Sequence, residues 1–87
     1  MAQYRIEYRK SAVKAFRVMP STLSIRFLAA FEQLANDLDD VGLDIKKLQG
    51  REGFRLRIGG WRAIYRIEND RLLIEVLNAG SRGDIYK

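Results

Sequence analysis

The alternation of apolar and polar residues predicts strands near both ends of the chain. Residues 4–8 place a tyrosine, an isoleucine and a second tyrosine at every other position, the period-2 pattern of a strand with one buried face. Residues 71–77 follow a turn at residues 68–70 and form a nearly continuous apolar run. That run indicates a strand that is buried on both faces.

Two helices are predicted after the first strand. Ser11 is the expected N-cap of the first helix, which runs to about Met19 and ends at Pro20. Its expected buried residues are Val13, Phe16 and one of Val18 and Met19. The second helix has apolar residues at steps of three and four, so its stripe is expected to pack in the core. This stripe comprises Phe27, Leu28, Phe31, Leu34, Ala35 and Leu38.

Strict alternation of apolar residues and arginines predicts a hairpin from residue 54 to residue 67. Gly59 and Gly60 suit the positive-φ positions of a two-residue turn. With these glycines as the loop, Arg57 faces Arg62 across the hairpin. One face is then apolar, and the other carries Arg55, Arg57, Arg62 and Arg66 around Ile64.

These elements predict one α+β domain spanning residues 1–87. The expected order is β-α-α-β-β-β, with residues 46–50 as a connector before the hairpin. The small, antiparallel-rich sheet should carry both N-terminal helices packed on one side. A chain of 87 residues has room for a single core.

Composition removes several classes of site. The chain has no cysteine and no histidine, so it lacks disulfides, thiolate metal sites and the usual general base. We therefore expect no metal and no cofactor. Neither a signal peptide nor a membrane-spanning segment is evident, so the expected location is the cytoplasm, without membrane association.

The net charge of +5 is unevenly placed along the chain. Residues 32–44 carry five carboxylates and no lysine or arginine, whereas residues 46–66 carry two lysines and five arginines against Glu52 alone. Such a local cationic patch is typical of a nucleic-acid binder.

The pairing of Arg57 with Arg62 asks for a counter-charge, because like charges directly opposed across a sheet are destabilising. A bound polyanion would supply it, and guanidinium forks match phosphate geometry. The alternative is a solvated sheet face whose arginines pair with scattered carboxylates. Because Glu52 is the one carboxylate nearby in the sequence, anion binding is the favoured interpretation.

Several short motifs, taken in order, resemble RelE-type toxins of the RelE/ParE superfamily. They are Lys47-Leu48-Gln49-Gly50, Phe54-Arg55-Leu56-Arg57, Trp61-Arg62-Ala63-Ile64-Tyr65 and the tail from Gly80 to Tyr86. The resemblance implies the toxin of a type II toxin–antitoxin system, held inactive by a cognate RelB-like antitoxin. It also implies a metal-independent endoribonuclease that cleaves mRNA in the A site of the 70S ribosome and so inhibits translation.

The resemblance also assigns roles to residues. The implied reaction is attack of a ribose 2′-hydroxyl on the adjacent phosphate, with catalytic roles for Arg57, Arg62, Arg82 and Tyr86. Arginines would stabilise the charge that develops on phosphorus, and Tyr86 would stack on a base or transfer a proton. The remaining RNA-binding residues are expected to be Lys47, Arg51, Arg55 and Arg66.

One departure from the family concerns proton transfer. Well-studied RelE toxins carry lysines where this chain has Arg55 and Arg57, and an arginine effectively cannot lose its proton. The base is then Tyr86, a carboxylate such as Glu7 or Glu52, another lysine, or solvent.

Two other functions stay open. One is a ParE-like DNA gyrase inhibitor without nuclease chemistry, and the other is a basic module that only binds RNA.

Overall fold

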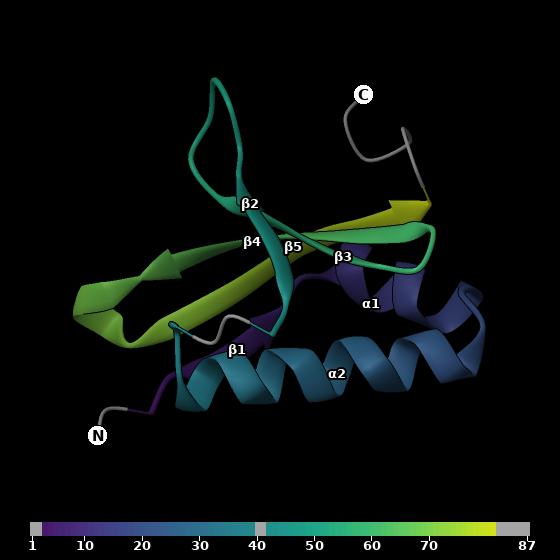
Figure 1. Ribbon diagram of the computed structural model, residues 1–87, viewed down its shortest axis with the longest axis horizontal. Helices are drawn as coiled ribbons and strands as arrows, with labels where there is room; N and C mark the ends of the chain where they lie inside the picture. The colour runs from purple at the N-terminus through teal and green to yellow at the C-terminus, as the bar shows by residue number, and fades with distance from the viewer. Residues whose placement is uncertain (1–2, 40–41, 82–87) are drawn as a thin grey trace.

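The computed structural model describes residues 3–39 and 42–81, which form one mixed five-stranded sheet with two helices packed on a single face (Figure 1). The elements in chain order are β1 (Arg5–Tyr8), α1 (Lys10–Val18), α2 (Ser21–Asn36), β2 (Asp44–Lys47), β3 (Phe54–Ile58), β4 (Trp61–Glu68), a 3₁₀ turn (Asn69–Arg71) and β5 (Leu73–Ser81). The strand order is β1-β5-β4-β3-β2; β1 and β5 are parallel and all other neighbours are antiparallel. The predicted α+β fold, with both helices on one side, is confirmed.

The edge strand β2 was not predicted. Residues 46–50 were expected to be a connector, but Asp44–Lys47 pairs antiparallel with β3. Charged residues suit an edge strand, because they discourage pairing with another chain. The β2–β3 connection then extends away from the helices, above the open face of the sheet (Figure 1). The register sets Asp44 opposite Arg57 and Lys46 opposite Arg55.

The hairpin of β3 and β4 has the predicted register. Ile58 lies opposite Trp61, Arg57 opposite Arg62, Leu56 opposite Ala63 and Arg55 opposite Ile64. The turn differs in one respect, because Gly59 has a φ of +61° whereas Gly60 does not adopt a positive φ. A positive φ at the first central position alone is the pattern of a type II′ turn. Either turn closes a two-residue loop, so the register is unaffected.

The first helix begins one residue before the predicted N-cap, and Phe16 and Met19 face the core as predicted. Ser11 lies inside α1 and donates from Oγ to the backbone oxygen of Leu77 at 3.3 Å rather than capping the helix. Val13 is exposed, so the prediction that it is buried was wrong. The residues that do pack inward are Ala12, Ala15, Phe16 and Met19. Pro20 lies at the N-cap of α2, so it ends one helix and starts the next.

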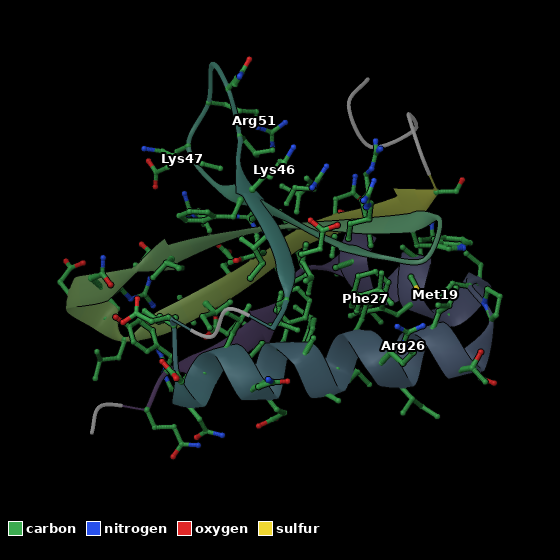
Figure 2. The ribbon with its side chains drawn as sticks, in the orientation of Figure 1. Met19, Arg26, Phe27, Lys46, Lys47 and Arg51 are labelled. Atoms are coloured by element: carbon green, nitrogen blue, oxygen red, sulfur yellow. The ribbon has the colours of Figure 1, made fainter. Side chains whose placement is uncertain are left out.

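The helix α2 supplies the centre of the core (Figure 2). Phe31 is fully buried and meets Tyr65 edge-to-face, with ring centroids 5.4 Å apart. The other buried residues of this helix are Phe27, Ala30, Leu34 and Ala35. Leu28 is 43% exposed, and Leu38 packs against the core from beyond the end of α2, so the helical stripe lacks these two predicted residues. This packing anchors β3 and β4 from one side, and the two helices leave their other side uncovered.

The strand β5 lies between β1 and β4 and is buried on both faces, as its apolar run predicted. Leu73 and Ile74 are adjacent, point to opposite faces, and are 1% and 0% exposed. The β4–β5 ladder shifts register between Ile64 and Tyr65, so Leu77 has no partner in it. After this shift Arg66 lies opposite Glu75.

Candidate nucleic-acid interface

The open face of the sheet gathers cationic side chains from three neighbouring strands. Alternation along β3 and β4 turns their arginines away from the helices, and the β2–β3 register adds Lys46 beside Arg55. We call this surface the cationic face and define it by Lys46, Arg55, Arg57, Arg62 and Arg66. Figure 2 shows the labelled Lys46 on the side of the sheet away from α2.

The tip of the hairpin forms a small hollow on this face. Its lining consists of Arg57, Gly59, Gly60 and Arg62. The arginines are a directly opposed pair on β3 and β4, so two guanidinium groups border a space walled otherwise by glycine backbone. Fixed cations beside an uncrowded backbone suit a phosphate group.

Asp44 is a carboxylate beside the arginines that was not expected there. Its Oδ2 accepts a hydrogen bond from Arg57 Nε at 2.9 Å, and its Oδ1 accepts one from Arg55 Nη2 at 3.2 Å. The expectation that Glu52 is the one nearby carboxylate was therefore wrong, because β2 brings Asp44 against β3. The alternative interpretation, arginines paired with carboxylates, is confirmed for these two residues.

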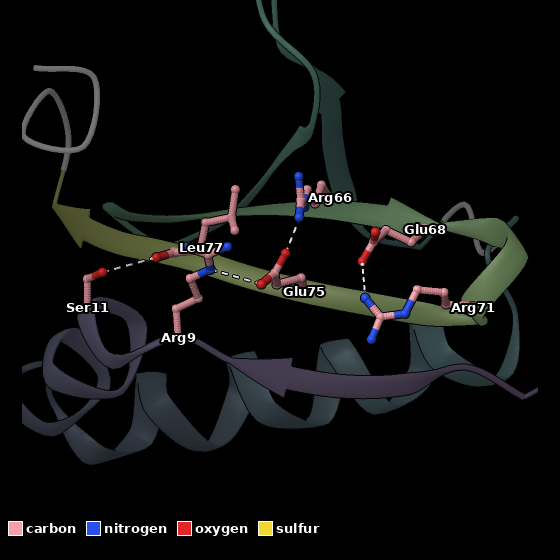
Figure 3. A network of polar contacts seen from close by, with 7 residues as sticks. All are labelled: Arg9, Ser11, Arg66, Glu68, Arg71, Glu75 and Leu77. Carbon is pink, nitrogen blue, oxygen red and sulfur yellow. Dashed lines mark hydrogen bonds and ion pairs between the residues drawn. The ribbon is translucent and has the colours of Figure 1, made fainter.

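Glu75 provides a second counter-charge, at the other side of the cationic face (Figure 3). It accepts hydrogen bonds from Arg66 Nε at 2.7 Å and from Arg9 Nε at 2.8 Å. The hydrogen bond from Arg9, together with that from Arg66, lowers the pKa of the Glu75 carboxyl. The hydrogen bond to Glu75 in turn raises the pKa of Arg66 above its ordinary value. Ion pairs with Asp44 and Glu75 thus hold Arg55, Arg57 and Arg66 of the cationic face, while the chain as a whole keeps a net charge of +5.

The remaining RNA-binding candidates lie in different places. Arg51 is exposed in the β2–β3 loop, on the side of the sheet away from the helices (Figure 2). Lys47 lies opposite Phe54, an apolar residue of the helix-facing side, so the alternation of β2 separates it from Lys46. Arg82 and Tyr86 lie outside the described residues, and their placement stays a prediction.

Sequence reasoning missed Lys46 as a site residue. The signal that finds it is the pairing of β2 with β3, which could not be used while residues 46–50 were treated as a connector. Lysine differs from the arginines around it because it can lose its proton. Lys46 is thus a lysine that the register places on the cationic face, and lysines were among the groups named as possible bases.

The tyrosines of the described residues do not supply a proton-transfer group on this face. Tyr4, Tyr8 and Tyr65 pack with the core on the helix side. Burial raises the pKa of Tyr65 to about 12, and burial together with the charge of Glu32 raises that of Tyr8 to about 12. Both phenols therefore stay protonated and inward.

Neither a metal centre nor a membrane span is found in the part of the chain that the structure describes. Residues 3–39 and 42–81 hold no group of three or more carboxylates placed to ligate a metal ion. The helices in the same ranges are too short or too polar to cross a bilayer.

Comparison with known proteins agrees with this fold. The protein-family model for the ParE toxin of the type II toxin–antitoxin system parDE matches residues 6–86 of this chain. No curated protein matches the chain. A chain of the archaeal RelE–RelB complex from Pyrococcus horikoshii is 30% identical with a TM-score of 0.80, and the match covers 97% of this chain and 99% of that one.

Two further solved structures extend the likeness. A chain of the RelB–RelE antitoxin–toxin complex from Methanococcus jannaschii is 26% identical, with a TM-score of 0.76 over 92% of this chain and 94% of that one. A chain of the intact RelBE toxin–antitoxin complex of E. coli shares the fold at 17% identity, with a TM-score of 0.76 over 90% and 95% of the two chains. The chain therefore belongs to the ParE toxin family of type II toxin–antitoxin systems and has the fold of a RelE-type toxin.

Proposed function

We propose that the cationic face binds RNA and that the chain is a metal-independent endoribonuclease that cleaves mRNA in the ribosomal A site. The observation that carries this proposal is the convergence of Arg55, Arg57, Arg62 and Arg66 with Lys46 on one open sheet face. Contacts with phosphate groups supply most of the affinity of nucleic-acid binders, and clusters of lysine and arginine make these contacts. Action on the 70S ribosome would place the toxin in the cytoplasm.

The proposed reaction needs only the RNA and side chains. The ribose 2′-oxygen forms a bond to the adjacent phosphorus, and the bond to the 5′-oxygen of the next nucleotide breaks. The products are a 2′,3′-cyclic phosphate and a 5′-hydroxyl end, so one proton leaves the 2′-hydroxyl and one reaches the leaving oxygen. Arg57 and Arg62 border the hollow at the hairpin tip and would stabilise the extra negative charge on the phosphate oxygens.

Proton transfer is assigned to groups other than the arginines. Lys46 is the candidate on the cationic face, and Tyr86 is the candidate from the tail, outside the described residues. Tyr86 also offers a ring on which an unstacked base could lie, and Arg82 would add a further phosphate contact. Comparing Tyr86→Phe with Lys46→Met separates these assignments, since each removes one titrating group.

The proposed protein partner is a RelB-like antitoxin. Solved relatives are complexes of RelE with RelB, and a surface with excess positive charge suits an acidic segment that folds on contact. Such a segment would occlude Arg57 and Arg62 or displace the tail that carries Tyr86. Hydrogen exchange at residues 54–66 and 80–87 in the complex tests this, and unprotected segments with undiminished RNA binding would contradict it.

The match to the ParE toxin model favours a second candidate, a ParE-like inhibitor of DNA gyrase. Primer extension on translated mRNA separates the two candidates. Ribosome-dependent breaks in mRNA support the nuclease, whereas DNA damage without RNA breaks supports the gyrase inhibitor. If neither occurs, only passive RNA binding remains. Arg62→Ala is the negative control, which should not cleave mRNA, because it removes an arginine side chain from the hollow without changing the apolar face.

A further inference from the structure

Asp44 holds two guanidinium groups of the cationic face through its two carboxylate oxygens. Oδ2 accepts from Arg57 Nε at 2.9 Å, and Oδ1 accepts from Arg55 Nη2 at 3.2 Å. A phosphate that bridged the same arginines would use two of its oxygens in the same way. Asp44 thus accepts from two donors that are equally suited to a phosphate.

Asp44 and Glu75, which form ion pairs with arginines of the cationic face, differ in how easily they could be displaced. The Glu75 side chain is 12% exposed and lies on an interior strand between Arg9 and Arg66. The Asp44 side chain is 42% exposed and lies at the start of an edge strand. Exposed ion pairs stabilise a fold weakly, so the contacts of Asp44 can break at small cost, whereas those of Glu75 cannot.

The two arginines that Asp44 holds are prepared to bind another anion. Arg57 uses Nε for Asp44, and its side chain is 49% exposed beside the hollow at the hairpin tip. Arg55 is only 13% exposed, and its buried Nε has no hydrogen-bond partner among the described residues. Loss of Asp44 without a replacement anion would therefore leave the largely buried guanidinium group of Arg55 without its counter-charge.

We propose that Asp44 is a specificity-determining residue, an internal counter-ion that occupies a phosphate position on Arg55 and Arg57 until RNA displaces it. This inference rests on the proposed RNA binding. In the free chain Asp44 offsets the repulsion between Arg57 and Arg62, which are directly opposed. During binding it competes with phosphate, so only a ligand that contacts several cations at once displaces it. An isolated phosphate has no such advantage.

The variant Asp44→Asn tests the inference through two effects of opposite sign. The free protein should become less stable to urea, because the arginines lose their counter-charge. Affinity for a labelled single-stranded 12-nucleotide RNA should rise about three- to tenfold, the change expected when two exposed ion pairs no longer compete. A residue that only supports the fold would weaken RNA binding as it weakens the protein.

Glu52→Gln is the matched control. Glu52 lies in the neighbouring β2–β3 loop, where its charge acts on Arg66 of the same face through space, but it makes no ion pair within the described ranges. Its loss changes the net charge equally, so it measures the effect of charge alone. RNA affinity should change about twofold or less in this variant, as expected for an unpaired surface charge at moderate salt. If Asp44→Asn gains no more affinity than Glu52→Gln, the inference is overturned. Asp44→Ser serves as the second variant should the asparagine protein fail to fold.

A mutant cycle separates this inference from the proposed function. In a protein that also carries Arg55→Ala and Arg57→Ala, the gain in RNA affinity from Asp44→Asn should vanish, because the two arginines with which the carboxylate pairs are absent. A gain of the same size in both backgrounds would mean that Asp44 acts only through net charge. If the two arginine substitutions leave RNA affinity unchanged, the RNA-binding face itself is wrong, and this inference falls with it. If they weaken binding but Asp44→Asn brings no gain, only this inference is wrong.

Discussion

Glu75 accepts a hydrogen bond from Arg66 Nε at 2.7 Å across the β4–β5 ladder, and the two residues are direct partners in its register. The same carboxylate accepts from Arg9 Nε at 2.8 Å, just before α1. One side chain thus connects the edge of the cationic face to the helical layer. Arg66 is oriented by this fixed contact, in contrast to the more exposed pairing of Arg57 with Asp44.

The stability of the protein should fall at acid pH through Glu75. Its hydrogen bonds with Arg9 and Arg66 hold its folded-state pKa below the ordinary value of 4.5. The stabilisation is therefore fully present above pH 4.5 and is lost as the pH falls through the lower, folded-state pKa. Urea unfolding of wild type and Glu75→Gln from pH 7 to pH 3 measures this. The wild type should be more stable at neutral pH by about 1–3 kcal/mol.

The difference in the free energy of unfolding between wild type and Glu75→Gln should shrink as the pH falls toward 3. Asp70→Asn is the control, since Asp70 is exposed in the 3₁₀ turn and forms no ion pair among the residues described. A difference between wild type and Glu75→Gln that stays constant down to pH 3 would contradict the linkage.

Two glycines of the β2–β3 loop should differ in their tolerance of alanine. Gly53 has a φ of +124°, and a Cβ there would lie 2.9 Å from the backbone oxygen of Tyr65. Gly50 also has a positive φ, +75°, but a Cβ there would meet no atom within 4 Å. Gly50→Ala should therefore cost about 1–2 kcal/mol, the strain of a left-handed residue. Gly53→Ala should cost clearly more, because β4 must also shift. Chemical denaturation compares them, and equal losses would be evidence against the close approach of this loop to β4.

Removing Arg62 should abolish cleavage while sparing the fold. A transition-state donor contributes about 10²–10³ in rate, so Arg62→Ala should reduce mRNA cleavage by that factor. Arg62→Lys keeps the charge but loses the planar fork, and it should recover only part of the activity. Arg17→Ala, an exposed arginine of α1 in the helical layer, is the charge-matched control. Cleavage by Arg62→Ala at the rate of Arg17→Ala would remove Arg62 from the proposed site.

The hairpin could be predicted in detail because its register follows from local information. Two glycines fix the loop, and strict alternation fixes the faces. The pairing of Arg57 opposite Arg62 could therefore be predicted from the sequence. β2 could not be predicted, because four residues with adjacent lysines carry no clear period and an edge strand depends on its neighbour. Because β2 was not predicted, Asp44 and Lys46 could not be placed beside the arginines, which they approach through the pairing of β2 with β3.

The helix α1 shows a second limit of sequence reasoning. Val13 was expected inside because it is apolar, yet the core takes the small Ala12 where α1 packs beside the sheet. A short helix with few large apolar residues leaves the rotation about its axis to be set by tertiary contacts. The Ser11 hydroxyl is one such contact, since it bonds to Leu77 of β5.

RNA binding should depend on salt in proportion to the phosphates that the cationic face contacts. Four to five contacts on single-stranded RNA give a log–log slope of about −3 to −3.5, from about −0.7 per phosphate. The individual arginines should differ, because the Arg57 side chain is 49% exposed and that of Arg55 only 13%.

Arg57→Ala should therefore reduce the steepness by about 0.7, one phosphate contact, whereas Arg55→Ala should change it less. Arg17→Ala, in the helical layer, should leave the slope unchanged. Fluorescence anisotropy of a labelled RNA between 50 and 300 mM potassium chloride gives these slopes. A wild-type slope near zero would exclude a phosphate-binding surface, and equal effects of Arg17→Ala and Arg57→Ala would move the RNA off the cationic face.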